Sequence, residues 1–203
     1  MTFSPRTRRT RALSLACVLI ACVFIGLIYR FFFIDDELND TKGAAGFRLF
    51  TILSNIFAGL VATMSVPYLI DRRMSAWMQR LLYCMGTTCA VTFLLSICIV
   101  TPTYGFYYAM FEESDLYLHT LAPLAGIGLF FTATDISSFR FKDACIAAIP
   151  AVSYAFVYTF MVFAVNYWPD FYTIRSYMPP MVFAIGSIPV VLGISEVLRR
   201  VQL

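Results

Sequence analysis

Six apolar segments, each long enough to cross a lipid bilayer, constrain the fold of this chain more than any other feature. They cover approximately Ala12–Ile34, Phe47–Ile70, Leu81–Thr101, Leu116–Thr134, Asp143–Asn166 and Pro180–Leu198. A helix rises about 1.5 Å per residue, so about 20 apolar residues span a hydrocarbon core of about 30 Å. Only 13% of the residues are charged, against about 25% in a typical soluble domain. We therefore predict an all-α membrane protein, a bundle of six transmembrane helices.

The first apolar segment follows a short basic stretch, residues 1–11 (MTFSPRTRRTR), as in a secretory signal peptide. However, this segment is longer than the apolar region of a signal peptide, and it ends in FFFIDDE rather than in small residues. We therefore expect an uncleaved first helix. The predicted organisation is a basic cytoplasmic tail over residues 1–11 and a single six-helix transmembrane domain over residues 12–203.

Basic residues lie at the two ends of the chain and in every second connection between apolar segments. Eleven of the fifteen Lys and Arg residues follow this pattern, namely Arg6, Arg8, Arg9, Arg11, Arg72, Arg73, Arg80, Arg140, Lys142, Arg199 and Arg200. Because cytoplasmic connections carry an excess of Lys and Arg, both termini are predicted to be cytoplasmic. We expect an integral multi-pass membrane protein, in the plasma (inner) membrane if the cell is bacterial.

The composition argues against several other classes of protein. The basic residues lie at the ends of apolar segments and not along one face, so we expect no nucleic-acid partner. All six cysteines fall within apolar segments and none forms a C-x-x-C pair. We interpret them as small hydrophobic residues in helix interiors. With one histidine there is no ordinary metal-ligand set, and we expect neither metal nor cofactor. The sequence leaves the oligomeric state open.

His119 is the only histidine and lies just inside the fourth apolar segment, in LYLHTLAPL. An ionisable side chain is costly within a membrane, so it is a functional candidate by default. Thr51 lies four residues past the start of the second segment, and His119 lies three residues past the start of the fourth. Both segments are expected to cross in the same direction, which places both side chains roughly 5 Å inside the outer boundary. This shared depth is compatible with contact between Thr51 and His119.

Polar neighbours of these two residues are candidates for supporting roles. Asp115 lies one turn before His119. It is a candidate to hydrogen-bond the imidazole and fix its tautomer, or else an ordinary solvated residue. In the second segment, small and polar residues share one helix face, namely Thr51, Ser54, Asn55, Ala58, Ala62 and Ser65. We interpret this stripe as a helix-packing seam, in which the amide of Asn55 needs a hydrogen-bond partner.

At these residues the chain resembles the androgen-induced protein family, which includes the androgen-dependent TFPI-regulating protein and bacterial integral-membrane relatives. The similar stretches are FTILSN, LHTLAP, YAFVYTFMVFAVNYWPDFY and LGISEVL. The best understood members are membrane-embedded threonine hydrolases that cleave fatty acid esters of hydroxy fatty acids. The resemblance implies Thr51 as nucleophile and His119 as its base. The spacing from His119 to Pro123 is one residue shorter than in the animal proteins, and the interval from Thr51 to His119 is also shorter.

Two functions stay open at this point. The first is a lipid-ester hydrolase acting on a membrane lipid, for which the resemblance implies fatty acid esters of hydroxy fatty acids. Asn55, Arg48 and Asn166 are candidates, from depth alone, to donate a hydrogen bond to the oxyanion. The alternative is a non-catalytic multi-pass membrane protein, either a small transporter or an interaction partner. Transporters usually contain internal repeats and polar groups near the midplane. The sequence shows no evident repeat, and its distinctive polar groups lie towards one side.

Overall fold

The computed structural model describes residues 5–33, 43–71, 73–135 and 139–201, and within these ranges it is helical apart from short connections. Six helices are long and apolar enough to cross a membrane, namely Thr7–Phe33, Phe50–Asp71, Ala76–Tyr104, Glu113–Ala133, Phe141–Ala164 and Pro180–Val201. This confirms the prediction of an all-α chain with six apolar helices. Lys42, Arg72 and the first four residues of the predicted tail lie outside the described residues.

Several of the six long helices are built from more than one helical segment. In chain order the segments are α1 (Pro5–Ile28), η1 (Tyr29–Phe33), η2 (Gly43–Arg48), α2 (Phe50–Asp71), α3 (Ala76–Leu95), η3 (Ser96–Val100), α4 (Thr101–Tyr104), α5 (Phe106–Phe111), α6 (Glu113–Asp115), η4 (Leu116–Leu121), α7 (Ala122–Ala133), α8 (Phe141–Thr159), η5 (Phe160–Ala164), α9 (Ile174–Tyr177) and α10 (Pro180–Val201). The first helix begins at Pro5, so residues 5–11 of the predicted tail continue the helix.

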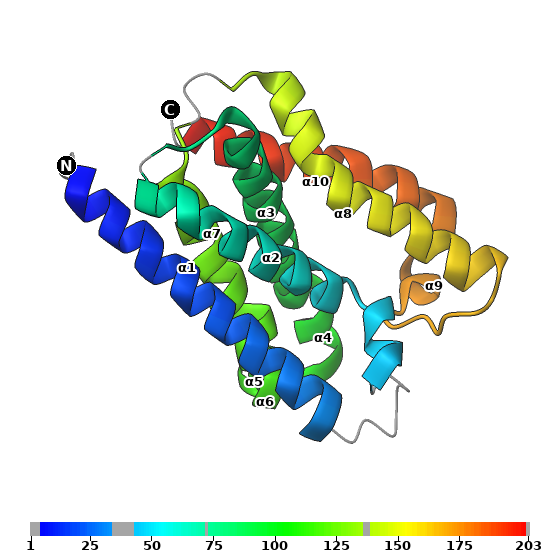
Figure 1. The fold of residues 1–203 in the computed structure, drawn as a ribbon. Coiled ribbons are helices and arrows are strands. Elements are labelled where there is room, and N and C mark those ends of the chain that lie inside the picture. The colour runs from blue at the N-terminus through cyan, green and yellow to red at the C-terminus, as the bar shows by residue number, and fades with distance from the viewer. Residues whose placement is uncertain (1–4, 34–42, 72, 136–138, 202–203) are drawn as a thin grey trace.

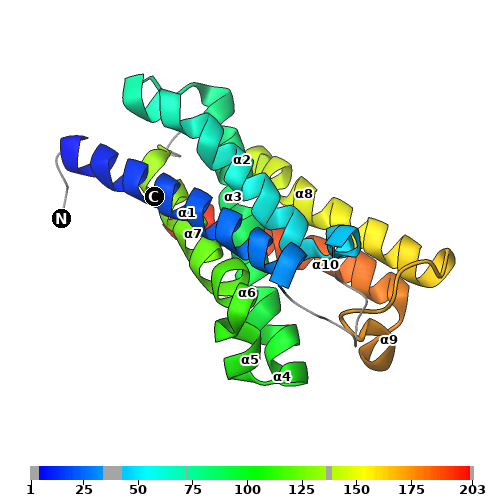
Figure 2. The ribbon, with the colours of Figure 1, turned by 60° about the horizontal axis from the view of Figure 1, so that its bottom comes forward.

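The six long helices form two groups (Figures 1 and 2). Helices α1, α2, α3 and α7 pack around one another, whereas α8 and α10 lie side by side and join the bundle mainly through α3. Helix α1 begins and α10 ends at the same end of the molecule, at the upper left of Figure 1. The short helices α4, α5 and α6 lie together at the far end of α3 and α7.

Arginine side chains fasten the helices together at the end where α1 begins. Arg8 donates from Nε to the carbonyl oxygen of Thr132 (2.8 Å) and from Nη2 to that of Thr134 (2.6 Å). Arg9 Nη2 donates to the carbonyl oxygen of Ile70 (2.8 Å). The last carbonyl groups of a helix lack partners within it and carry partial negative charge, so they are favourable acceptors for arginine. These contacts bring the start of α1 to the ends of α2 and α7.

A buried hydroxyl cluster holds the α8–α10 pair against α3. Tyr83 on α3 donates to the carbonyl oxygen of Ser195 (2.8 Å), and Ser195 Oγ donates to the carbonyl oxygen of Ala144 on α8 (3.0 Å). Neither Tyr83 nor Ser195 is exposed at all. One hydrogen-bonded cluster therefore contacts three of the long helices.

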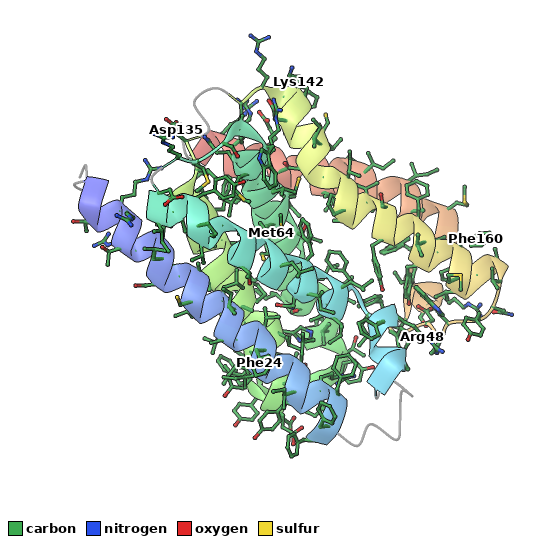
Figure 3. The ribbon with its side chains drawn as sticks, viewed as in Figure 1. Phe24, Arg48, Met64, Asp135, Lys142 and Phe160 are labelled. Atoms are coloured by element: carbon green, nitrogen blue, oxygen red, sulfur yellow. The ribbon has the colours of Figure 1, made fainter. Side chains whose placement is uncertain are left out.

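Large apolar side chains project outward around the molecule, as Figure 3 shows for Phe24, Met64 and Phe160. Such an apolar exterior suits a bundle surrounded by lipid. Two of the six cysteines belong to this exterior, because Cys17 and Cys98 are exposed. All six cysteines lie within helices, as predicted, but only Cys22, Cys84 and Cys89 are buried in the bundle.

Gly26 permits close approach of α1 to η4. A Cβ atom at this position would lie 2.6 Å from Leu118 Cδ2 and 3.0 Å from Tyr117 Cβ. We expect Gly26→Ala to lower the stability of the bundle by about 1–3 kcal/mol through overpacking, measured by thermal unfolding in detergent. Gly193→Ala on α10 is the matched control, because a Cβ there meets no atom within 4 Å. Equal melting temperatures for the two variants would contradict this prediction.

Candidate active site

The structure brings Thr51 and His119 into contact. Thr51 Oγ1, in the first turn of α2, lies 3.1 Å from His119 Nε2 in η4. The imidazole is almost fully buried, with 8% of the residue exposed, whereas Thr51 is partly exposed. The two residues are 68 positions apart in the chain, so the packing of η4 against α2 creates this pair.

The second ring nitrogen of His119 determines which tautomer is present. Nδ1 lies 2.9 Å from the carbonyl oxygen of Ala109 in α5. A carbonyl oxygen only accepts hydrogen bonds, so Nδ1 carries the proton and donates it to Ala109. In the neutral ring Nε2 then presents its lone pair, and the hydroxyl of Thr51 donates to it. This is the arrangement that a histidine needs in order to take a proton from a hydroxyl nucleophile.

The backbone around His119 is a π-helical turn over Leu116–Leu121, immediately before α7. Pro123 lies near the start of α7. Proline has no N–H group, and its ring clashes with the carbonyl group four residues earlier in a regular α-helix, which here belongs to His119. A wider π turn is a common solution next to functional side chains. Thr120 Oγ1 also donates to the carbonyl oxygen of Met110 (2.7 Å), so two consecutive residues of η4 bind α5.

Asp115 lies near the imidazole but is not its closest partner. Asp115 Oδ1 is 3.7 Å from His119 Nδ1, beyond hydrogen-bond distance. The tautomer is therefore set by the carbonyl group of Ala109 rather than by Asp115.

Asn55 joins α2 to the turn that carries His119. Its Nδ2 donates to the carbonyl oxygen of Thr51 (2.7 Å) and to that of Leu118 (2.9 Å). The residue is 2% exposed. Because both amide hydrogens already have acceptors, Asn55 has no free N–H for an oxyanion. Asn55 therefore links the first turn of α2 to η4, the turn that carries His119.

We expect Asn55→Leu to lower the stability of the protein by about 1–3 kcal/mol, because the carbonyl group of Leu118 would lose its side-chain donor in a buried setting. Thermal unfolding in detergent measures this loss. Thr63→Val is the control on the same helix, since the Thr63 hydroxyl bonds only to Gly59 of its own helix and the residue is exposed. If Asn55→Leu is as stable as the Thr63→Val control, the Asn55 amide contributes nothing to the stability of the protein.

The two other candidate oxyanion donors have partners elsewhere. The guanidinium group of Arg48 lies over the ring of Tyr167, 5.2 Å from its centre. Figure 3 shows Arg48 at the end of the molecule opposite Lys142. Asn166 is exposed, and its Oδ1 accepts from Arg175 Nη2 (2.7 Å). The side chains of Arg48 and Asn166 therefore contact Tyr167 and Arg175, and not Thr51 or His119.

The first turn of α2, which carries Thr51, also contains the first backbone amides of the helix. The first N–H groups of a helix find no acceptor within it. Phe50 N–H donates to Tyr172 Oη (3.1 Å), and Leu53 N–H donates to the carbonyl oxygen of Leu49 (3.2 Å). Desolvation raises the pKa of Tyr172, so this hydroxyl stays protonated at neutral pH. Between these two amides lie those of Thr51 and Ile52, for which α2 supplies no carbonyl group.

Sequence reasoning did not identify Ala109 or Tyr172 as parts of this site. Ala109 acts through its backbone oxygen, which carries no signal in the side-chain pattern. Tyr172 lies in an aromatic stretch whose sequence alone does not indicate a contact with α2. Its hydroxyl reaches α2 because the connection after α8 folds back, with Tyr158 donating to Asp170 (2.7 Å).

Comparisons of this chain with models of known families, with curated proteins and with solved structures each return no match.

Proposed function

We propose that this protein is a membrane-embedded hydrolase of lipid esters, with Thr51 as nucleophile and His119 as general base. The observation that carries the proposal is the 3.1 Å contact between Thr51 Oγ1 and Nε2 of His119. A weak nucleophile such as a threonine hydroxyl needs an adjacent base, and the base needs a third group to orient it. The carbonyl group of Ala109 meets the last requirement.

The reaction we propose has two steps. In the first, Thr51 Oγ attacks the ester carbonyl carbon while its proton passes to His119 Nε2, and the tetrahedral intermediate collapses as Nε2 protonates the leaving alcohol. In the second, water attacks the acyl-threonine, giving its proton to Nε2, and the carboxylic acid leaves as the proton returns to Thr51 Oγ. The Asp115 carboxylate lies 3.7 Å from Nδ1 of the imidazolium formed in each step.

The negative charge of the tetrahedral intermediate needs donors near Thr51. We propose the backbone amides of Thr51 and Ile52 for this role, in place of the side chains of Asn55, Arg48 and Asn166. These amides lie in the first turn of α2, where the helix dipole is also positive. Removing one donor of this kind costs about 3–4 kcal/mol of transition-state stabilisation in a well-studied hydrolase, so two such amides are a substantial contribution.

We further propose the substrate class and orientation that the sequence suggested. The substrate is a lipid ester, with fatty acid esters of hydroxy fatty acids as the class implied by the resemblance to the androgen-induced protein family. Both termini are cytoplasmic, and the membrane is the plasma membrane if the cell is bacterial. The arginines at the end where α1 begins support this orientation, because positive charge is retained on the cytoplasmic side.

A non-catalytic function is the competing proposal, and one observation favours it. Asn55 uses both of its amide hydrogens to link α2 with η4, as a purely structural hydrogen-bonded cluster would. In that case the contact between Thr51 and His119 would only stabilise the bundle.

Labelling with a fluorophosphonate probe separates the two functions. The probe reacts with an activated hydroxyl nucleophile, so we expect the native protein to be labelled and Thr51→Ala to be unlabelled. Thr63→Ala is the control, because Thr63 lies on the same helix as Thr51 but is exposed and bonds to Gly59 of its own helix. Labelling of a residue other than Thr51, or none in the folded native protein, would favour the non-catalytic function.

A further inference from the structure

An apolar pocket of about 540 Å³ lies between α3, η3, α8 and α10, with Phe50 of α2 in its wall. Its small residues are Ala151 and Ala155 on α8 and Gly186 on α10. A Cβ atom added at Gly186 would meet no other atom within 4 Å, so the space beside this glycine is open. Neither Thr51 nor His119 lines the pocket, although Phe50 and Tyr172, which bond to each other at the start of α2, lie in its wall.

The hydroxyl groups in the pocket wall are already hydrogen-bonded within the protein. Tyr154 donates to the carbonyl oxygen of Arg48 (2.7 Å), Ser187 donates to that of Ala184 (2.7 Å), and Tyr172 accepts from the amide of Phe50 (3.1 Å). The rest of the wall is apolar. A pocket of this kind offers water few partners and suits an apolar ligand.

The rim of the pocket is apolar as well. Leu94, Val182 and Val190 line the pocket and are between 41% and 61% exposed. These residues belong to helices long and apolar enough to span a membrane, so the medium at the rim is lipid hydrocarbon. Along α10 the lining residues extend from Val182 to Ile194, a length of about 18 Å. One leaflet contributes about half of a 30 Å hydrocarbon core, so the pocket matches one extended lipid chain.

We infer that this pocket binds one hydrocarbon chain of a membrane lipid, which enters sideways from the bilayer between α3 and α10. The occupant is a single long alkyl or acyl chain, since each hydroxyl group of the wall already bonds within the protein and the length corresponds to one leaflet. The inference does not rest on the proposed hydrolysis. A chain bound here is held specifically, unlike lipid that surrounds the outer face of the bundle.

A photoactivatable palmitate carrying a diazirine on its chain tests this inference in purified protein. We expect crosslinks within residues 91–99, 151–155 and 182–194, located by peptide mass spectrometry. Gly186→Phe fills the open space and is expected to reduce this labelling by about tenfold or more. Gly193→Phe is the matched control on the same helix, because Gly193 is exposed and does not line the pocket. Equal labelling of the two variants, or labelling spread evenly over α1 and α2, would overturn the inference.

The native protein provides a second measurement that needs no substitution. Cys98 lines the pocket, whereas Cys17 is exposed on α1 outside it. We expect unmodified palmitate to slow alkylation of Cys98 by an N-alkylmaleimide and to leave Cys17 unaffected. Equal protection of both cysteines, or of neither, would contradict specific binding. Thr51→Ala should retain both the crosslinks and the protection, so the failure of the proposed hydrolysis is distinguishable from failure of the pocket.

Discussion

Thr51→Ala is expected to lower kcat/KM for a long-chain 4-methylumbelliferyl ester by about 10⁴-fold or more, the scale seen when a hydrolase loses its nucleophile. Thr51→Ser is expected to remain active, since serine keeps the hydroxyl that lies 3.1 Å from His119 Nε2. Steady-state hydrolysis in detergent micelles measures both variants. The result depends on the hydroxyl itself, because the methyl group of threonine has no part in the proposed proton transfer.

Thr63→Ala controls for the loss of a threonine from α2. Thr63 is exposed and bonds to Gly59 of its own helix, so its removal should leave hydrolysis unchanged. Folding is monitored by the melting temperature of each variant. A folded Thr51→Ala protein that hydrolyses the ester at the native rate would exclude Thr51 as nucleophile.

His119→Gln is expected to lower kcat/KM by about 10²–10⁴-fold, the usual contribution of a general base. A glutamine amide can donate to the carbonyl group of Ala109, but it cannot take a proton from Thr51. The same ester assay and a thermal unfolding curve are measured together. If His119 is a general base, the His119→Gln variant is stable but slow. If His119 is only structural, the same variant keeps both its stability and its activity.

His119→Ala completes this comparison. Removing the ring leaves the carbonyl group of Ala109 without this donor in a buried place, at a cost of about 1–3 kcal/mol. We therefore expect the alanine variant to be both slow and less stable, and the glutamine variant to be slow only. If the two variants lose activity only in proportion to their stability, His119 is structural.

The long helices were predictable from the sequence because hydropathy and length alone define them. The pairing of Thr51 with His119 could also be predicted. The chain has a single histidine, and each residue lies three or four positions past the start of its apolar segment. The start of the first helix could not be predicted, because the basic residues within 5–11 are typical of a solvated tail. In the structure Arg8 and Arg9 instead bind the carbonyl ends of α7 and α2.

The supporting groups of the site were the hardest to predict. Depth in the membrane says how far along a helix a residue lies, but not which neighbour its side chain meets. For this reason Asn55, Arg48 and Asn166 were plausible donors from depth, yet each bonds or stacks elsewhere. The acceptor for His119 is a backbone oxygen of α5, and every residue has such an oxygen, so no side chain marks this one.

The division of the long helices into two groups has a consequence for biosynthesis. Thr51, Asn55, Ala109 and His119 all lie in the part of the chain that is synthesised before α8 begins. Their contacts with one another are therefore possible while the last two helices are still in the ribosome or at the insertion machinery. The lipid-chain pocket needs residues of α8 and α10, so it is completed last. A nascent chain could thus form the contact between Thr51 and His119 first, and the lateral pocket only once α10 has been synthesised.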